Sequence, residues 1–535
     1  MASTDSANVS KQLHVAMFPW LAFGHIIPFL HLSKFIAEKG HKVSFLSTTR
    51  NIQRLPTLPS NLSPLINLVK LTLPRVQELP ENAEATMDVL TEDVHYLKKA
   101  YDGLKPQVAQ FLEIESPDWI IYDFAPYWLP EVAASLGISR AYFSIINAWF
   151  GDVHYLKKAY DGLKPQVAQF LGKESPDWII YDFAPYWLPE VAAGLGISRA
   201  YFSIINAWFG VFFGPSKDTM NVSDERKTLE DFLTPPKWIP FPSNLCYRKH
   251  EATWTLGSGS ADDSGVSDAY RSRMILKGSD CMFIRYCYEF EPQWLTLLQE
   301  LYHLPVVPVG LMPPETPTNV GDDHKDNSWV TIKKWLDGQQ KGHVVYVALG
   351  SEVMVNKSEL GELALGLELS GLPFFWALRK PAGSTECNSL ELPDGFIERT
   401  RNRGMIWTSW VPQLQILGHE SVGGFLTHCG WGSIVEGLMF GHPLIMLPFL
   451  VDQGLNARVL VDAKVGIEVP RNDEDGSFTK DSVARSLSKV AVDDEGKIYK
   501  ANAMTLSKTF CDTKLQRKYI DDFIDYLVTH MRVQL

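Results

Sequence analysis

A glycine-rich segment in the C-terminal half of the chain has the composition of a diphosphate-binding turn. Residues 427–437 read THCGWGSIVEG, so two glycines and Ser433 join an apolar run to a helical pattern. A helix N-terminus preceded by glycines binds phosphate through unpaired N–H groups and the helix dipole. Val435 stands where a dinucleotide fingerprint has its third glycine, and no GxxxxGK[ST] loop occurs, which disfavours NAD enzymes and P-loop NTPases. Ser433 and Glu436 also fit a helix capping box, so their spacing leaves both interpretations open.

A histidine and two aspartates could form a general base with an orienting carboxylate. His25 follows the first apolar run, and Asp123 and Asp182 each end a copy of the sequence DWIIYD. The carboxyl ends of parallel strands meet at one edge of a sheet, where a carboxylate can orient a histidine that accepts a proton. In the alternative interpretation His25 caps a helix and Asp123 starts a turn. With 14 histidines in the chain, the pattern alone favours this structural alternative.

The elements that must position these residues alternate between apolar runs and helical patterns. The predicted strands are 12–18, 41–48, 67–73, 118–124, 139–146, 344–351, 374–380, 404–410, 422–428 and 442–450. The predicted helices are 27–40, 93–112, 128–137, 357–371, one from Ser433 onward and an amphipathic one at 518–531. Such alternation predicts parallel, doubly wound α/β domains.

The domain boundaries follow from a stretch that is rich in Pro, Gly, Asp and Asn. This stretch, residues 311–330, has no apolar period and is the predicted linker. It separates a predicted N-terminal domain (1–310) from a C-terminal domain (331–515), which a closing helix (516–535) follows.

A segment of 59 residues is written twice in the N-terminal domain. Residues 93–151 recur as 152–210 and differ at three positions, Glu113/Gly172, Ile114/Lys173 and Ser135/Gly194. Two units that are nearly identical do not make a solenoid, which needs at least three repeats. Because a completed sheet has no vacancy for both copies, we expect one copy in the sheet and the other extruded, with Asp123 and Asp182 competing for His25.

Composition excludes several classes of protein. The 535 residues carry a net charge of −12 without a run of Lys or Arg, which argues against nucleic acid or an anionic membrane as partner. Six scattered cysteines without a CxxC pair favour reduced thiols and no metal site. The apolar run 15–32 is interrupted by Pro19, Gly24 and Pro28, so we interpret it as a strand and a helix start, with no membrane span. These features predict a cytoplasmic protein.

The 44 residues from Trp410 to Gln453 carry a family resemblance. The sequence WVPQLQILGHESVGGFLTHCGWGSIVEGLMFGHPLIMLPFLVDQ resembles the signature box of plant UDP-sugar-dependent glycosyltransferases of family 1. FPWLAFGHIIPFL (18–30) and YVALGSE (346–352) fit the same family, whose fold is GT-B, two facing Rossmann-like domains. The surrounding sequence is similar to the subgroup that extends sugar chains, which includes steviol-glycoside glucosyltransferases and soyasaponin rhamnosyltransferases.

The resemblance assigns roles to individual residues of the donor site. The implied uracil contacts are Trp410, by stacking, together with Val411 and Gln413, and the implied ribose contact is Glu436. The implied diphosphate contacts are Ser351, His428 and Ser433, and the implied sugar contacts are Trp431, Asp452 and Gln453. One position departs from the family, because Gly432 stands where Asn is usual, which removes one phosphate hydrogen bond.

The implied reaction is inverting transfer by a hexosyltransferase (EC 2.4.1.-). His25 removes a proton from an acceptor hydroxyl, oriented by Asp123 or Asp182, and UDP leaves toward the helix N-terminus. The implied donor is UDP-glucose, with rhamnose also open, and the acceptor is a terpenoid or flavonoid glycoside. The implied enzyme needs no cofactor or metal and acts as a monomer. The alternative is a UDP-sugar-binding protein that the duplication impairs. Acceptor contacts are predicted at Phe18, Phe23, Trp149 or Trp208, and within 245–265.

Overall fold

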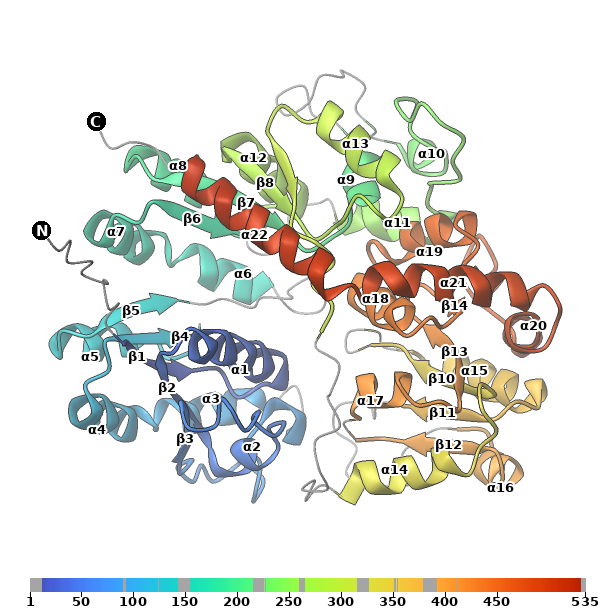
Figure 1. Ribbon diagram of the computed structural model, residues 1–535, viewed down its shortest axis with the longest axis horizontal. Helices are drawn as coiled ribbons and strands as arrows, with labels where there is room; N and C mark the ends of the chain where they lie inside the picture. Colours follow the sequence, from blue (N-terminus) through green and yellow to red (C-terminus); the bar gives the residue numbers. More distant parts are fainter. Residues whose placement is uncertain are drawn as a thin grey trace, which may run out of the picture. The chain divides into compact units, whose positions relative to one another are not determined.

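The structure is a computed structural model. It describes residues 12–89, 93–123, 125–142, 154–214, 226, 228–258, 265–314, 327–350, 353, 355–378, 392–409 and 411–530. The described residues form two compact units, the first reaching to residue 142 and the second beginning at residue 154 (Figure 1). The division therefore falls between the two copies of the duplicated segment. The domain boundaries that we draw from the sequence stay a prediction.

The first unit is built on a parallel five-stranded sheet. Its strands are β1 (His14–Phe18), β2 (Lys42–Thr48), β3 (Ile66–Leu71), β4 (Trp119–Tyr122) and β5 (Ser139–Tyr142). Their order is β3-β2-β1-β4-β5. The helices are α1 (Phe23–Glu38), α2 (Thr49–Gln53), α3 (Val94–Asp102), α4 (Lys105–Glu115) and α5 (Leu129–Ser135), with a 3₁₀ turn η1 (Thr86–Asp88).

Strand β1 is buried on both faces of this sheet, as its continuous apolar run predicts. Val15 and Met17 pack into one core, and Ala16 and Phe18 pack into the core on the opposite face. The predicted strands at 41–48 and 118–124 contain β2 and β4, and the predicted strand at 67–73 overlaps β3, which begins one residue earlier. The buried centre of the sheet thus fixes the edge at which His25 and Asp123 lie.

The predicted helix 93–112 is two helices. Helix α3 ends at Asp102, and α4 begins at Lys105 with a proline in its first turn. A Cβ at Gly103 would lie 2.9 Å from Cγ of Pro74, so the turn between the two helices packs against that proline. Proline at the first helical positions is favourable, whereas it would interrupt a continuous helix.

The second unit contains a four-stranded parallel sheet that includes the second copy. Its strands are β6 (Trp178–Tyr181), β7 (Ser198–Ser203), β8 (Cys281–Ile284) and β9 (Val306–Pro308), in the order β6-β7-β8-β9. The helices of this part are α6 (His154–Asp161), α7 (Lys164–Glu174), α8 (Leu188–Gly194), α9 (Ala207–Phe213), α10 (Leu229–Phe232), α11 (Lys249–Ser258), α12 (Asp268–Gly278) and α13 (Pro292–Leu301).

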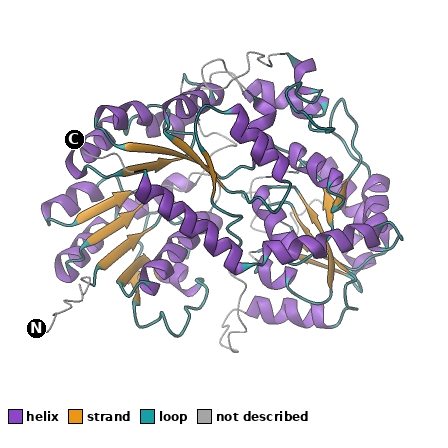
Figure 2. Ribbon diagram, turned by 45° about the horizontal axis from the view of Figure 1, so that its top comes forward, coloured by secondary structure: helices purple, strands orange, loops and turns teal. Residues whose placement is uncertain are grey.

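The second unit also contains a six-stranded parallel sheet. Its strands are β10 (Val344–Ala348), β11 (Phe374–Ala377), β12 (Gly404–Trp407), β13 (Val422–Thr427), β14 (Leu444–Met446) and β15 (Gly466–Glu468), in the order β12-β11-β10-β13-β14-β15. The helices are α14 (Asn327–Asp337), α15 (Lys357–Ser370), α16 (Phe396–Thr400), α17 (Gln413–Leu417), α18 (Trp431–Met439), α19 (Gln453–Asp462), α20 (Lys480–Ala491) and α21 (Gly496–Phe510). Helices flank the sheets on both faces (Figure 2).

The last helix, α22 (Thr513–Thr529), packs on the four-stranded sheet. Phe523 and Tyr526 contact the ring of Phe283 on β8 edge-on, and the indole N–H of Trp178 on β6 donates to Leu527 O at 2.9 Å. The predicted closing helix is therefore present, and Figure 1 shows it running beside β7 and β8. Among the described residues, no helix is both long and apolar enough to cross a membrane.

Neither copy of the duplicated segment is extruded, so our expectation from the sequence was wrong. Copy one contributes β4, which pairs with β1, and copy two contributes β7, which pairs with β8. Within each copy the two strands pair in the same register, Trp119 with Ser139 and Trp178 with Ser198. The expectation assumed one continuous sheet. Among the described residues, the five-stranded sheet instead takes the two strands of copy one and the four-stranded sheet takes the two strands of copy two.

Candidate active site

The first cluster of predicted site residues lies at the carboxyl edge of the sheet in the first unit. Asp123 directly follows β4, and His25 lies in the first turn of α1, which follows β1. Because β1 and β4 are neighbours in parallel register, their carboxyl ends bring these side chains together. Nδ1 of His25 lies 2.6 Å from Oδ2 of Asp123, whose side chain is fully buried, while the side chain of His25 is 18% exposed. The structure thus brings His25 together with Asp123, one of the two aspartates that the sequence offered, and the catalytic role of the pair stays a prediction.

The carboxylate of Asp123 is held from the backbone as well. The N–H of Trp20 donates to the same Oδ2 at 3.2 Å, and the N–H of Asp123 donates to Phe18 O at 3.3 Å. Tyr101 packs beneath, stacked on Phe18 at 4.9 Å between ring centroids. Burial raises the pKa of the Tyr101 phenol well above its usual value, and the charge of Asp123 raises it further. These surroundings therefore keep the Tyr101 phenol neutral, while the carboxylate of Asp123 contacts His25 and the N–H of Trp20.

Asp182, the counterpart of Asp123 in copy two, belongs to the second unit and has a different partner. Its Oδ1 accepts the N–H of Ala184 at 2.9 Å, two residues along the chain. Burial raises the pKa of Asp182 above its usual range. The local geometry of Asp182 is that of a turn, which is the structural alternative that the sequence raised for Asp123.

Three polar side chains that could read a nucleoside form a chain of hydrogen bonds in the second unit. Tyr346 on β10 donates its hydroxyl to Oε1 of Gln413 at 3.0 Å, and Nε2 of Gln413 donates to Oε2 of Glu436 at 2.6 Å. Burial raises the pKa of Glu436, and the hydrogen bond from Gln413 and the charge of Arg285 oppose that rise. Gln413 and Glu436, which the sequence assigned to uracil and ribose, are thus in contact with each other.

The predicted diphosphate turn forms the N-terminus of α18. The helix begins at Trp431 with Gly430 as its N-cap residue. The capping box of Ser433 and Glu436 is therefore wrong, because Ser433 lies inside the helix and Glu436 bonds Gln413. Ile434 donates the first intrahelical hydrogen bond, to Gly430 O at 3.0 Å. The three N–H groups before it lie at the open end of the helix, where an anion binds favourably.

His428 lies between two glycine turns beside this helix end. A Cβ at Gly350, which has φ +74°, would lie 2.6 Å from Nε2 of the ring, and a Cβ at Gly430 would lie equally close. Both positions therefore require glycine. Among the described residues, the buried Nδ1 of His428 has no hydrogen-bond partner, and burial lowers the pKa of the ring to about 4. At neutral pH the imidazole is uncharged, so it can offer a phosphate one N–H donor but no cation.

The side chains assigned to the sugar already form hydrogen bonds within the protein. Trp431 is buried, and its indole N–H donates to Arg285 O at 3.1 Å, so its backbone N–H is what remains for a ligand. Oε1 of Gln453 accepts the N–H groups of Phe449 and Leu450, both at 2.9 Å, which fixes the preceding loop. Oδ2 of Asp452 accepts Nδ2 of Asn456 at 2.7 Å.

Sequence reasoning missed Asn456, whose amide is saturated by four hydrogen bonds. Its Nδ2 donates to Asp452 and, at 2.8 Å, to Cys429 O. Its Oδ1 accepts Nδ2 of Asn206 at 2.6 Å and the indole N–H of Trp208 at 2.8 Å. Its place after the Asp-Gln pair, one helical turn beyond Asp452, is the signal that could have found it.

The predicted acceptor contacts are largely core residues. Phe18 and Trp208 are fully buried, whereas Phe23 is half-buried. Within 245–265, Glu251 on α11 forms a buried ion pair with Arg458, Oε2 to Nη2 at 2.7 Å, so that part of the segment is structural. Ser351, Trp410 and Trp149 lie outside the described residues, as do residues 259–264.

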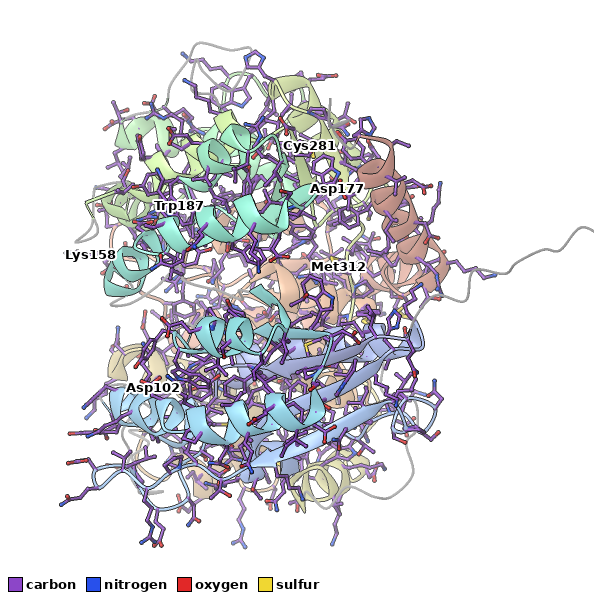
Figure 3. The ribbon with its side chains drawn as sticks, turned by 90° about the vertical axis from the view of Figure 1, so that its left-hand side faces the viewer. Asp102, Lys158, Asp177, Trp187, Cys281 and Met312 are labelled. Carbon is purple, nitrogen blue, oxygen red and sulfur yellow. The ribbon has the colours of Figure 1, made fainter. Side chains whose placement is uncertain are left out.

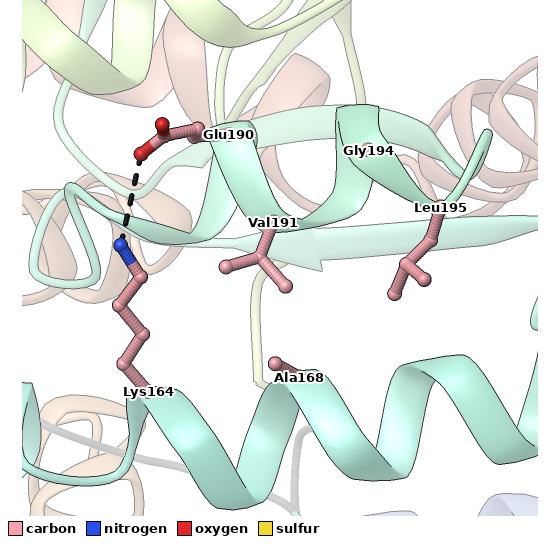
Figure 4. A pocket seen from close by; sticks show the side chains of 6 residues that line it. All are labelled: Lys164, Ala168, Glu190, Val191, Gly194 and Leu195. Carbon is pink, nitrogen blue, oxygen red and sulfur yellow. Dashed lines mark ion pairs between the residues drawn. The ribbon is translucent and has the colours of Figure 1, made fainter.

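A shallow hollow in copy two carries none of the predicted site residues. It has a volume of about 400 Å³ and lies between α7 and α8, and Figure 4 shows the ion pair Lys164–Glu190, 3.6 Å, at one end. Its remaining lining is formed by Ala168, Val191, Gly194 and Leu195. A gap between these two helices at the surface accounts for the hollow.

Comparison with known proteins shows the family of the chain and supports its fold. Residues 316–530 match the family described as UDP-glucoronosyl and UDP-glucosyl transferase. The chain is 58% identical over 534 residues to UDP-glycosyltransferase 91D1 of Stevia rebaudiana, covering 99% of this chain and 96% of that protein. It is 39% identical to soyasaponin III rhamnosyltransferase of Glycine max, covering 97% and 96%. The structure of Os79 from O. sativa in complex with UDP is similar, with TM-score 0.56 and 18% identity, covering 96% and 100%.

The protein is thus an α/β enzyme of the GT-B fold that transfers a sugar from a UDP-sugar to a small-molecule acceptor (EC 2.4.1.-). It belongs to the plant UDP-glycosyltransferase family 1, in the UGT91 subgroup.

Proposed function

We propose that the protein transfers glucose, with inversion, from UDP-glucose to a hydroxyl of a terpenoid or flavonoid glycoside. The observation that carries the proposal is the His25–Asp123 contact of 2.6 Å at a sheet edge. Asp123 occupies Nδ1 of the ring, so Nε2 is the atom that takes the proton of the acceptor hydroxyl. The buried carboxylate then stabilises the imidazolium that forms.

The proposed reaction forms one bond at C1 of the sugar and breaks another. The acceptor oxygen forms a bond to C1 of the sugar, and the bond between C1 and the β-phosphate oxygen breaks. The electron pair leaves on UDP, and the acceptor proton moves to His25. We assign the N–H groups at the start of α18 and the neutral ring of His428 as hydrogen-bond donors to the diphosphate.

Glucose is the donor we favour because Gln453 ends the signature box, and the acceptor class follows from the subgroup. UDP-rhamnose remains the competing donor, since soyasaponin III rhamnosyltransferase is 39% identical to this chain. Incubation of the purified protein with UDP-glucose or UDP-rhamnose and a panel of glycosides and aglycones, followed by mass spectrometry, tests both donors. An axial-to-equatorial change at C1 in the NMR spectrum of the product would support inversion.

A second candidate function is UDP-sugar binding without turnover. The observation that favours it is the duplication, which divides β1 and β8 between two separate sheets. The predicted base and its carboxylate belong to one unit, and Gln413, His428 and Glu436 belong to the other. Calorimetric titration with UDP separates the candidates, because binding without product formation on any acceptor would favour this second function. Restored turnover after deletion of residues 152–210 would assign the loss to the duplication.

A further inference from the structure

Arg285 is a cation that backbone carbonyl groups hold in place. It follows β8, which starts at Cys281, and its Nε donates to Leu311 O at 2.6 Å while Nη2 reaches Met312 O at 3.4 Å (Cys281 and Met312 are labelled in Figure 3). Within the described part of the chain Arg285 forms no ion pair. Desolvation lowers its pKa to about 10, which still leaves it protonated at neutral pH. The described residues therefore hold the positive charge of Arg285 through carbonyl oxygens and pair it with no carboxylate.

The third guanidinium nitrogen of Arg285 faces the first turn of α18. A Cβ at Gly432 would lie 3.8 Å from Nη1 of Arg285. A hydrogen bond holds Arg285 next to this turn, because the indole N–H of the preceding Trp431 donates to Arg285 O at 3.1 Å. Among the described residues Nη1 has no hydrogen-bond partner. A charged donor thus stands beside the N–H groups at the start of the helix.

Arg285 lies beside the position of Gly432. A Cβ there would make ordinary van der Waals contact with Nη1 at 3.8 Å, so the guanidinium is next to the position where the family resemblance implies an asparagine. The arginine therefore brings a positive charge close to the place where the family has a neutral amide. Glu436 is close enough to raise the pKa of Arg285 without pairing with it.

We propose that Arg285 binds the diphosphate of the UDP-sugar through Nη1 and supplies the contact that the missing side chain at Gly432 would otherwise make. The proposal rests on the proposed function, because it concerns the same donor site. As the bond between C1 and the β-phosphate oxygen breaks, negative charge grows on UDP. A fixed guanidinium stabilises that charge more than a neutral amide does.

The test is calorimetric titration of the Arg285→Gln variant with UDP, compared with NMR titration with uridine, which lacks phosphate. We expect UDP affinity to fall about 10- to 100-fold, in the range of one charge-assisted hydrogen bond, while uridine affinity stays within twofold. Arg403→Gln is the matched control. Arg403 also donates to backbone carbonyls, those of Leu367, Glu368 and Leu372, and it should leave the ratio of the two affinities unchanged.

A rescue variant separates the loss of charge from a loss of structure. In Arg285→Gln/Gly432→Asn the new amide takes the vacated space, and at least half of the lost UDP affinity, on a logarithmic scale, should return. Equal losses for UDP and uridine, or an unchanged UDP affinity in Arg285→Gln, would overturn the proposal. If the unmodified protein binds UDP but turns nothing over, the proposed function fails while these binding measurements still decide the role of Arg285. Absence of UDP binding by the unmodified protein would overturn both.

Discussion

The indole N–H of Trp208 donates to Oδ1 of Asn456 at 2.8 Å, in a fully buried contact between the duplicated segment and α19. The two residues are 248 positions apart in the chain. Through the other end of its amide, Asn456 holds Asp452 and the carbonyl of Cys429, which adopts φ +68° just before the α18 turn. The end of copy two is thereby hydrogen-bonded to Asn456, the side chain that also holds Asp452 and Cys429.

Replacing Asn456 should be costly because three of its four partners, Asn206, Trp208 and Cys429, are buried. In Asn456→Ala the indole, the amide of Asn206 and the carbonyl of Cys429 lose their partner inside the protein. We expect the free energy of unfolding to fall by about 2–4 kcal/mol, measured by urea denaturation. The control is Asn244→Ala, which removes an exposed hydrogen bond to Asp462 and should change stability by less than about 0.5 kcal/mol. Equal effects of the two variants would contradict a special role for Asn456.

Substitution of Asp123 should impair turnover far more than substitution of its duplicate. Asp123→Asn keeps the shape but removes the charge beside Nδ1 of His25, so we expect kcat to fall about 10²- to 10⁴-fold. Asp182→Asn should change kcat by less than about threefold, because Asp182 bonds the N–H of Ala184. Steady-state kinetics with UDP-glucose measures both. A larger loss in Asp182→Asn would transfer the orienting role to copy two.

The base itself is tested by His25→Ala. We expect turnover to disappear while the calorimetric affinity for UDP stays within twofold, since the residues we assign to the donor lie in the other unit. Turnover that persists would remove His25 from the mechanism.

Acid should destabilise the protein through His442. Its Nε2–H donates to Leu417 O at 2.6 Å, and burial lowers the pKa of the ring to about 4, against 6.5 in the unfolded chain. Between these values the unfolded state binds more protons, so the stabilisation is complete above pH 6.5 and is lost as the pH falls toward 4. We expect a loss of about 2–3 kcal/mol across this range.

Urea denaturation from pH 7 to pH 4.5 measures that dependence. His442→Gln keeps a donor for Leu417 O and should reduce the slope of the curve, while His428, whose pKa burial also lowers to about 4, retains its own contribution. The exposed His343, whose Nδ1 lies 2.8 Å from Lys341 O, supplies the control, because His343→Gln should leave the pH dependence unchanged. A curve that stays equally steep without His442 would assign the dependence to other groups.

Deletion of either copy should give nearly the same protein. The chains without 93–151 and without 152–210 differ at three positions, and in each the remaining copy can pair with both β1 and β8. We expect both variants to fold with similar melting temperatures and at least the turnover of the full chain. Aggregation of one variant alone would show that the two copies are not interchangeable, since an unpaired strand edge promotes association.

Much of the fold could be predicted from the sequence because the signals are local. Continuous apolar runs marked β1, β10 and β13, and the helical patterns placed α15 and α22 to within a few residues at most ends. The His25–Asp123 contact could be predicted because neighbouring parallel strands bring their carboxyl ends together. The proposed role of Arg285 could not be predicted, because it depends on the position of Gly432, 147 residues further along the chain.

The sequence by itself determined the strand and helix pattern, the family resemblance of the donor box and the presence of two nearly identical segments. Because the two copies are nearly identical, no local signal could assign either copy to a particular sheet. The strand DWIIYD, for example, has the same strand propensity in both copies. The tertiary structure decided their partners. Because copy one pairs with β1, its Asp123 lies against His25. Because copy two pairs with β8, its C-terminal end lies against Asn456. Strand pairing and buried hydrogen bonds join residues that are distant in the chain, so only the folded protein distinguishes two segments that the sequence writes almost alike.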